Sequence, residues 1–243
     1  SSDLYIKTLG GDASLDPYIQ LPSPFPKENL LVMIAPKVSI KYKNRDASYE
    51  QVINYIYSFI SKKVGNYFIY VPSYEYLDKL LEKFVIPENT NIHIQSKDMK
   101  EIEKMEFLNN FKEEPNETNL GFLVIGGAFS EGIDLVSDRL IGAIIVGVGM
   151  PKINFESDTI KDYYNAQDLP GYDYAYHNPG MNKVMQAVGR VIRSETDRGA
   201  ILLIDERYTH RNYQVLYKNT WSGYKIVFTP KEVEGLMTNF FKR

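Results

Sequence analysis

Residues 140–148 read LIGAIIVGV, and residues 120–126 read LGFLVIG. Short runs this apolar are typical of strands that are buried on both faces of a parallel sheet. Further strands are expected near 30–34, 67–71, 91–95, 200–204 and 224–228. Helical patterns separate these runs, and the alternation predicts an α/β fold with a mainly parallel sheet.

Amphipathic helices are predicted between the strands, because apolar residues recur there every three or four positions. The apolar positions are Val52, Ile56, Phe59, Ile60 and Val64 in the first helix, Leu77, Leu80, Leu81 and Phe84 in the second, and Met99, Ile102, Met105 and Phe107 in a charged helix over 98–112. Ser48 or Asp46 is expected to cap the first helix. A last helix is expected over 231–241, after Pro230. The sheet should therefore be covered on both faces.

The chain divides into two parts. Residues 1–28 carry four prolines and no clear period, so they are expected to form an extended lead-in to a folded domain over 29–243. Within that domain, residues 151–178 are polar, rich in Asp and Tyr, and too long for an ordinary connection. They are interpreted as an insertion that is functional or mobile. Its tyrosines are candidates for stacking on bases, namely Tyr163, Tyr164, Tyr172, Tyr174 and Tyr176.

The composition limits the classes of function. The formal net charge is −3 and the pI is about 5.7, so any nucleic-acid surface must be a local patch. The absence of cysteine excludes disulfides and thiolate-bound metal centres within these residues. His93, His177 and His210 lack metal-ligand spacing, so no metal site is expected. No apolar run approaches the roughly 20 residues of a membrane span, and no export signal is present, so a cytoplasmic protein without a membrane partner is expected.

A glycine-rich loop follows the strand at 120–126. Its glycines allow the backbone to approach a ligand closely, and Ser130, Glu131 and Asp134 add polar contacts. Loops after the strands of an open parallel sheet are also where ligands gather. On this pattern alone, a tight turn without a ligand explains the loop equally well.

Residues 180–193 are predicted to form a helix with two faces. Val184, Ala187, Val188 and Val191 make the apolar face. Gln186, Gly189, Arg190 and Arg193 lie at offsets of zero, three, four and seven, so they share the other face. A glycine inside a helix costs about 1 kcal/mol relative to alanine, which suggests that another group comes close to Gly189. The alternative is a solvated helix face with incidental arginines.

Together, these two segments resemble motifs V and VI of superfamily-two helicases of the XPD/DinG type. The family's motif VI, Q-x-x-G-R-x-x-R, precedes an apolar strand that ends in Asp-x-Arg-Tyr/Phe, and residues 186–208 read QAVGRVIRSETDRGAILLIDERY. Motif V contains S-E-G-I-D and a G-x-P turn, and residues 129–151 read FSEGIDLVSDRLIGAIIVGVGMP. SPFP at 23–26 and YFIYVPSYEYLDKL at 67–80 fall in the family's order. The resemblance implies a RecA-like three-layer α/β/α domain, the second motor domain of an ATP-dependent DNA helicase.

The resemblance also implies roles for individual residues. Arg193 would be the arginine finger that reaches the γ-phosphate of ATP, while Arg190 and Gln186 hold the phosphate and the attacking water. Glu131, Gly132, Asp134 and Gly189 would line the nucleotide site, with a helix N-cap as the alternative for Asp134. Ser73, Tyr74 and Ser130 would contact the backbone of single-stranded DNA. For Ser73 and Tyr74, the alternative is a helix-capping serine beside a core tyrosine.

Two elements of a complete motor are missing from the sequence, because it contains neither G-x-x-x-x-G-K-[ST] nor D-E-A-H. ATP and Mg²⁺ would be held mainly by a first motor domain of the same polypeptide, where any iron–sulfur cluster would also lie. These residues alone are therefore expected not to hydrolyse ATP. Relatives move 5′ to 3′ on single-stranded DNA. The resemblance therefore implies two partners, single-stranded DNA and the first motor domain of the same polypeptide.

Two other classes of function remain open. One is a catalytically inactive module with a helicase-like fold that binds nucleic acid or protein. The other is an α/β enzyme that binds a sugar nucleotide through the glycine-rich loop, which would leave the face of Gln186, Arg190 and Arg193 unexplained.

Overall fold

A computed structural model describes residues 10–12, 14–16, 25–129, 139–192, 194–221 and 223–242. Within these residues, parallel strands form one sheet in the order β3-β4-β2-β5-β6-β1-β7. The strands are β1 (Leu30–Ala35), β2 (Asn66–Val71), β3 (Thr90–Ile94), β4 (Thr118–Val124), β5 (Gly142–Val146), β6 (Gly199–Ile204) and β7 (Lys225–Ile226). The predicted parallel sheet is confirmed.

The four central strands form where the sequence has its longest apolar runs. All residues of β2, β4, β5 and β6 are buried, as expected for strands covered on both faces. Two strands are shorter than predicted. β5 stops at Val146 because Gly147 turns the chain with a φ of +86°, a conformation open to glycine. β7 has only two residues and lies at the sheet edge.

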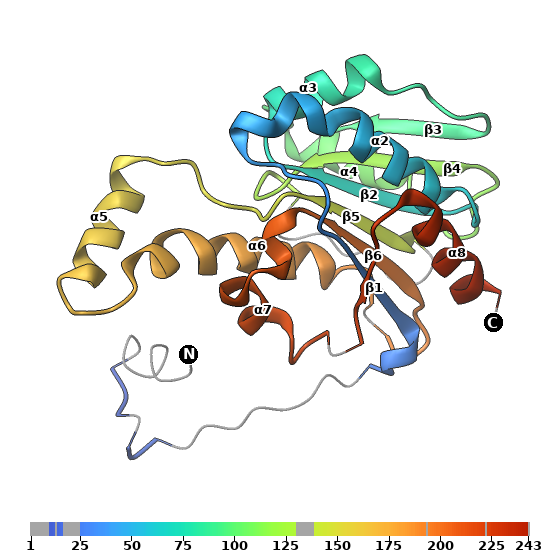
Figure 1. Ribbon diagram of the computed structural model, residues 1–243. Coiled ribbons are helices and arrows are strands. Elements are labelled where there is room, and N and C mark those ends of the chain that lie inside the picture. The colour runs from blue at the N-terminus through green and yellow to red at the C-terminus, as the bar shows by residue number, and fades with distance from the viewer. Residues whose placement is uncertain are drawn as a thin grey trace.

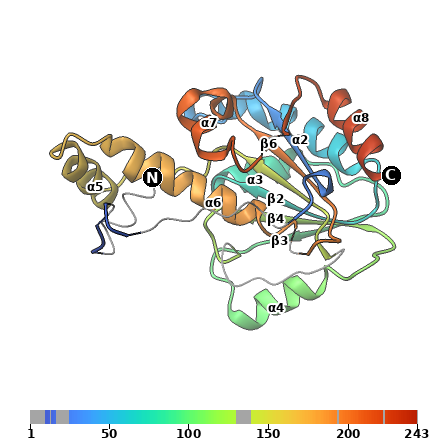
Figure 2. The same ribbon diagram turned by 90° about the horizontal axis from the view of Figure 1, so that it is seen from below.

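Helices cover both faces of the sheet, which confirms the three-layer prediction (Figures 1 and 2). One face carries α2 (Arg45–Ile60), α3 (Tyr74–Lys83) and α8 (Pro230–Phe241). The other carries α4 (Glu101–Asn109), α6 (Asn178–Val188) and α7 (Arg211–Tyr217). Short 3-10 helices lie at Lys27–Asn29, Tyr42–Asn44 and Glu206–Thr209.

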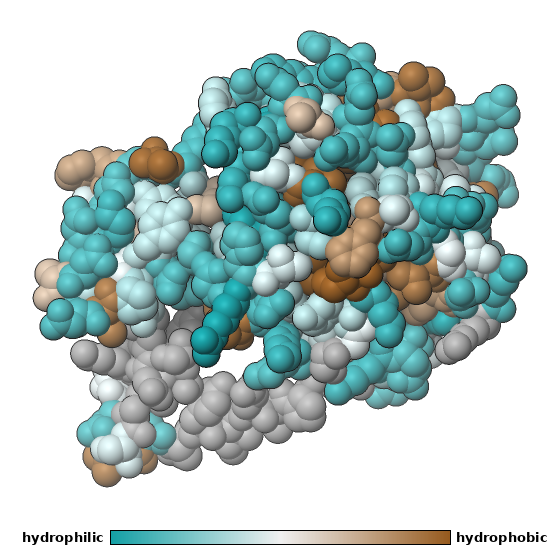
Figure 3. Space-filling view, in the orientation of Figure 1, coloured by the Kyte–Doolittle hydropathy of each residue, from teal (hydrophilic) through white to brown (hydrophobic). Residues whose placement is uncertain are grey.

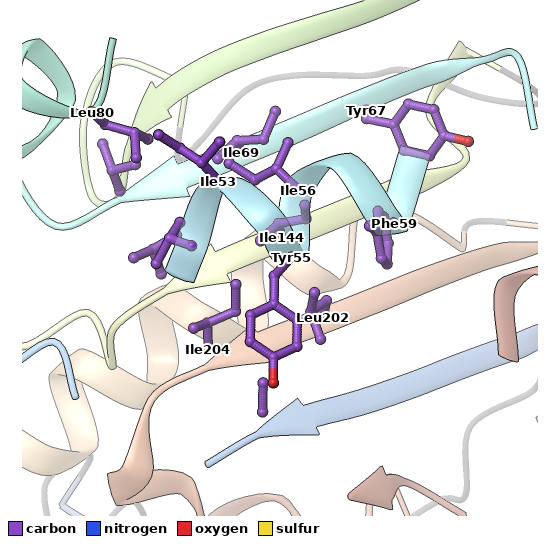
Figure 4. Close-up of a cluster of buried hydrophobic side chains, with 14 of the residues drawn as sticks. Ile53, Tyr55, Ile56, Phe59, Tyr67, Ile69, Leu80, Ile144, Leu202 and Ile204 are labelled. Carbon is purple, nitrogen blue, oxygen red and sulfur yellow. The ribbon is translucent and has the colours of Figure 1, made fainter. Parts of the chain in front are cut away.

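Each face has its own hydrophobic core. Figure 4 shows α2 lying over the sheet, with Ile56 and Phe59 directed toward Ile144 of β5 and Leu202 of β6. These four side chains are fully buried. Full burial of such a side chain contributes about 1.5–3 kcal/mol relative to exposure. The cores therefore fix the helices on the sheet and with them the loops at its two ends.

The start of α2 differs from the prediction. The helix begins at Arg45 after the N-cap residue Asn44, so neither Ser48 nor Asp46 is the cap. Ser48 lies one turn inside the helix, where its hydroxyl donates to the Arg45 carbonyl oxygen at 2.7 Å. Val64 lies beyond the end of the helix and is half exposed, because α2 stops at Ile60.

The predicted charged helix over 98–112 is shorter, and its buried face is different. α4 runs only from Glu101 to Asn109, and the side chain of Ile102 is 71% exposed. Phe107 and Phe111 are buried instead, with their ring centroids 5.4 Å apart. The predicted face is thus confirmed at Phe107 and at Met99, which packs against the same core, and is wrong at Ile102 and Met105, because aromatic packing against the sheet at the C-terminal end of α4 determines how the helix sits.

Residues 151–178, hereafter the arm, form a helical hairpin. α5 (Phe155–Asn165) leads through a tight turn into a π-helix (Asp173–His177) that continues directly as α6. Figures 1 and 2 show α5 lying away from the sheet, at the outer end of this long helix. A Cβ at Gly171 would collide with the Lys161 carbonyl oxygen, so the hairpin turn requires glycine. Several arm tyrosines stack on one another, with the Tyr164 and Tyr174 centroids 4.3 Å apart.

Candidate functional site

The structure describes only half of the predicted site residues. Ser130, Glu131, Gly132, Asp134 and Arg193 lie outside the described residues. Ser73, Tyr74, Gln186, Gly189 and Arg190 lie within them.

Ser73 and Tyr74 follow the carboxyl end of β2, at the edge where ligands of open parallel sheets bind. Ser73 is the N-cap of α3, and its Oγ accepts a hydrogen bond from the Tyr76 backbone N–H at 3.2 Å. Capping uses a lone pair of Oγ, so the hydroxyl hydrogen stays available to an acceptor such as a phosphate oxygen. The capping alternative and the proposed DNA contact are therefore compatible.

Tyr74 is held in place by Gln95, which sequence reasoning missed. The Gln95 amide donates from Nε2 to the Tyr74 hydroxyl at 2.8 Å, and its Oε1 accepts from the Val124 backbone N–H at 2.9 Å. The Tyr74 hydroxyl in turn donates to the Ser96 carbonyl oxygen. Burial raises the pKa of Tyr74, so the phenol stays neutral. Gln95 thereby connects the loop after β2 to the end of β4, where the glycine-rich loop begins.

A buried ion pair closes the carboxyl end of β6. Asp205 has no exposed surface and accepts from Arg207 Nε at 2.7 Å and Nη2 at 2.8 Å. Its Oδ2 also accepts from the Ile40 backbone N–H at 3.2 Å, in the loop after β1. Such a bidentate pair has high geometric specificity. The pair therefore fixes the loops after β1 and β6 relative to each other.

The end of α6 corrects the prediction of one continuous helix over 180–193. The helix stops at Val188, with Gly189 as its C-cap, so Gly189 is not inside a helix. A Cβ at Gly189 would meet only carbonyl oxygens of the preceding turn, so no other described group comes close there. Because the helix ends, Arg190 does not continue a helical face with Gln186. Gln186 is exposed and Arg190 partly buried, and the predicted apolar face is confirmed by the burial of Val184, Ala187, Val188 and Val191.

The residues after α6 lie at the amino end of the sheet. A Cβ at Gly199, the first residue of β6, would collide with the Val191 side chain. A compact turn follows the position of Arg193: Asp197 accepts from the backbone N–H of Ser194 at 2.9 Å and from its hydroxyl. Sequence reasoning did not identify Ser194 and Asp197 as a structural unit.

The opposite end of α6 packs on the carboxyl end of the sheet. A Cβ at Gly149, in the loop after β5, would lie 2.6 Å from the Gly180 carbonyl oxygen. The backbone of α6 can come this close to the loop after β5 because both positions are glycine. Between its ends, α6 spans about 15 Å at 1.5 Å per residue. The structure therefore puts the predicted residues on two separate surfaces, Ser73 and Tyr74 at one end of the sheet and Gln186 and Arg190 at the other.

Lys183 links α6 to the glycine-rich loop. The Lys183 side chain lies over Gly126, whose φ is +75°. A Cβ at Gly126 would be 3.0 Å from Lys183 Cδ, Cε and Nζ. Lys183 therefore brings a positive charge to the start of the loop that carries the predicted nucleotide contacts.

Among the described residues, no group of three or more His, Asp or Glu side chains is arranged to hold a metal ion. Nor is any described helix long and apolar enough to cross a bilayer. A cavity of about 650 Å³ opens at the amino ends of β3 and β4, between Tyr57, Val85 and Thr90. None of the predicted site residues that the structure describes lines that cavity.

Comparison with known proteins identifies a family. The model of the helicase C-terminal domain family matches residues 56–223, more than half of the chain. A probable ATP-dependent helicase of Methanocaldococcus jannaschii is 26% identical over 207 residues, covering 79% of this chain and 31% of that protein. The ATP-dependent DNA helicase chl1 of Schizosaccharomyces pombe is 28% identical over 193 residues, covering 71% and 22%.

Solved structures agree with this fold. A structure titled XPD helicase superimposes with a TM-score of 0.64 at 21% identity, covering 82% of this chain and 35% of that one. A second, titled XPD apo, gives a TM-score of 0.65 at 20% identity, covering 82% and 40%. The matched region thus spans less than half the length of each of these relatives and structures.

Proposed function

Because this chain belongs to the helicase C-terminal domain family, we propose that it is the second motor domain of an ATP-dependent DNA helicase of the XPD/DinG type that moves 5′ to 3′ on single-stranded DNA. The observation that carries the proposal is the separation of two polar surfaces by the length of α6. A motor domain must sense nucleotide at one surface and hold a strand at another, and a rigid helix couples the two.

The nucleotide surface is the end of α6, with Gln186 and Arg190, and Arg193, three positions further along the sequence, is proposed to act there too. ATP bound to the first domain would supply the phosphoryl group that is transferred to water. A guanidinium suits this surface, because its charge does not titrate near neutral pH and its planar fork matches phosphate oxygens. Arg193 is assigned as the finger that acts on the charge developing in the transition state. Arg190 and Gln186 orient the phosphate and the attacking water.

The chemistry of the donors fits half of a nucleotide site. These residues supply guanidinium and amide groups for phosphate, but the sequence has no phosphate-binding loop with its lysine. Mg²⁺ is proposed to be held with ATP mainly by the first domain, since the sequence contains neither the phosphate-binding loop nor D-E-A-H. An iron–sulfur cluster would likewise need cysteines from outside this chain.

The strand surface is the carboxyl end of the sheet, where Ser73 and Tyr74 follow β2. Ser130, in the glycine-rich loop, is proposed to join them. The Gln95 bridge supports joint movement of these loops, because Tyr74 and the end of β4 share one buried amide. Closure of the two domains around ATP would shift this surface along the strand, and hydrolysis would release it.

The test uses the full-length protein. ATP hydrolysis is measured with and without single-stranded DNA, and unwinding is measured on duplexes with a 5′ or a 3′ overhang. We expect DNA-stimulated hydrolysis and unwinding from the 5′ overhang. Arg193→Ala should reduce kcat by about 10³-fold, the low end for arginine fingers. Lys83→Ala is the control, since Lys83 is exposed at the C-terminal end of α3, on the face of the sheet opposite to α6.

The outcomes separate the competing functions. DNA binding without any ATP hydrolysis by the full-length protein would favour the inactive binding module. If Arg193→Ala hydrolyses ATP within about threefold of wild type, roughly 0.7 kcal/mol in activation free energy, the finger is not Arg193 and Arg190 becomes the candidate.

A further inference from the structure

The segment between β1 and α2 concentrates positive charge at the carboxyl end of the sheet. Residues 36–45, hereafter the basic segment, read PKVSIKYKNR, with four basic and no acidic side chains. The whole chain has a formal net charge of −3, so this is a local excess. Figure 1 shows the segment, in blue, rising from the end of β1 to the start of α2. Two carboxylates border it: Glu206, which pairs with Lys41 at 2.8 Å, and the exposed Asp46.

Arg45 has a positive charge that no described carboxylate neutralises by a salt bridge. Its Nε is buried and makes no hydrogen bond with any described residue. Its guanidinium carbon lies 5.3 Å from the ring centroid of Tyr42 and 5.9 Å from that of Tyr76. The two rings hold the guanidinium in position without using its charge for an ion pair. Such a group is ready to bind an anion with little loss of side-chain entropy.

Tyr42 is the aromatic part of this arrangement. Its side chain is 78% exposed, although it lies in a 3-10 helix fixed between β1 and α2. Arg45 lies against the ring, and a cation beside an aromatic ring is attracted to its face. The remaining exposed surface of the ring is available to a planar, uncharged partner. Lys43, also exposed, adds charge next to it.

This surface is continuous with the loop after β2. The ring of Tyr76 contacts Arg45, its backbone N–H donates to Ser73 Oγ, and its hydroxyl is hydrogen-bonded to Ser48 at 2.8 Å. Tyr42, Arg45 and Ser73 therefore share one side of the molecule, with Tyr76 beneath them.

We propose that Tyr42 and Arg45 form a binding site for single-stranded DNA. The guanidinium of Arg45 takes a backbone phosphate, and the exposed face of Tyr42 stacks on the adjacent base. Phosphate contacts by arginine and base stacking on tyrosine are the two interactions that hold single strands without regard to sequence. The site deepens the proposed function and rests on it, because it extends the strand surface beyond Ser73 and Tyr74.

The arm is the competing location, because its tyrosines were candidates for base stacking. It carries two lysines and five carboxylates, Glu156, Asp158, Asp162, Asp168 and Asp173, which repel a phosphate backbone. Figure 3 shows the arm at the left as mostly hydrophilic surface with separate apolar spots rather than one continuous patch. Tyr176 is buried, and Tyr164 is already stacked on Tyr174. The basic segment is therefore the better site for a strand.

The experiment measures binding of a fluorescein-labelled oligothymidylate to the full-length protein at several salt concentrations. Tyr42→Ala should weaken binding at least about fivefold, the low end for loss of one stacked base, and leave the salt dependence unchanged. Arg45→Ala should weaken binding and lower the slope of log K against log salt by about 0.7, the value for one phosphate of a single strand. Arg45→Lys, which keeps the charge, should keep the slope.

Each variant has a matched control. Tyr163→Ala removes a ring that is 62% exposed on the arm, and Lys63→Ala removes an exposed charge before β2, at the other end of the sheet. Neither should change affinity. Because Arg45 packs on Tyr76, Arg45→Ala could also destabilise the fold, so the thermal unfolding midpoint of this variant is measured. Tyr42 is exposed, so Tyr42→Ala tests the inference without a loss of stability.

Two results would overturn the inference. If wild type binds but Tyr42→Ala and Arg45→Ala bind within about twofold of it, or weaken no more than the controls, the strand lies elsewhere and the proposed function still stands. If wild type itself does not bind the oligonucleotide, the proposed function fails and the site fails with it.

Discussion

Gln95 and Tyr74, 21 positions apart in the sequence, are joined by a hydrogen bond of 2.8 Å between the buried amide and the phenol hydroxyl. The same amide accepts the N–H of Val124, the last residue of β4. One side chain thus sets the relative position of two loops at the carboxyl end of the sheet.

Gln95→Leu should destabilise the protein by about 1–3 kcal/mol, because it leaves the Val124 N–H without its partner in a buried place. Thermal unfolding measures the loss. Gln51→Leu, on the exposed side of α2, is the control and should stay within about 0.5 kcal/mol. Equal effects of the two substitutions would mean that the Gln95 bridge contributes nothing to stability.

Asp205→Asn should destabilise by up to about 3–5 kcal/mol, because Arg207, whose side chain is only 17% exposed, would lose the buried counter-ion Asp205. The shift in the urea midpoint at constant m-value reports this loss. Glu234→Gln breaks the Lys62–Glu234 pair of 2.6 Å, in which both side chains are more than a third exposed, and should cost at most about 1 kcal/mol. Similar losses in both variants would contradict the buried pair.

Gly180→Ala should destabilise the protein, whereas Gly235→Ala should stabilise it. A Cβ at Gly180 would lie 2.8 Å from the Val148 carbonyl oxygen, so α6 must move away from the loop after β5. A Cβ at Gly235 of α8 meets nothing within 4 Å, and alanine there should stabilise by about 0.5–1 kcal/mol through helix propensity. Differential scanning calorimetry of both variants checks the signs. Stabilisation by Gly180→Ala would disprove the close approach of the two backbones.

The pair between Lys41 and Glu206 should give a pH-dependent term in stability. Hydrogen bonds from Lys41 and then Ser39 lower the pKa of Glu206 below its ordinary value of 4.5. A lowered pKa means that the stabilisation is present above pH 4.5 and is lost as the pH falls through the folded-state value. The pair is solvent-screened, so the term should not exceed about 1 kcal/mol. Urea unfolding from neutral to acid pH should show a shallower loss in Glu206→Gln than in wild type.

The parallel sheet and most helices could be predicted because they depend on local patterns. Runs such as Ile144 and its neighbours are apolar throughout, which requires burial on both faces. Helix ends were harder. α2 begins after Asn44, whose side chain makes no capping hydrogen bond, rather than at Ser48, and α6 stops before Arg190, because backbone geometry at a few residues decides these points. The predicted buried face of α4 is wrong at Ile102 and Met105 but right at Phe107, since the helix is set by aromatic neighbours outside the local pattern.

The candidate site residues come from sequence motifs, and their roles stay predictions. Contacts between distant segments escaped prediction, because no local pattern reports them. Gln95 reads as one polar residue after a strand, and only the fold reveals that it meets Tyr74. The same holds for Arg45, whose place over Tyr76 depends on how α2 and α3 pack. The polar composition of the arm suggested a loop-like insertion, although it forms helices.

The π-helix at Asp173–His177 joins the arm to α6. It lies in line with α6, and a π turn is what a single extra residue produces inside an α-helix. Each residue of an α-helix turns the chain by about 100° and advances it by about 1.5 Å. A π turn takes up its extra residue within that one turn, so removing this residue would restore an ordinary α turn and leave the direction of α5 nearly unchanged. Removing a residue from the α-helical part of α6 would instead rotate α5 around the helix axis by about 100° and draw it in by about 1.5 Å. The direction of the arm therefore depends on the number of residues in α6, and the π turn is the place where this helix can lose a residue without turning the arm.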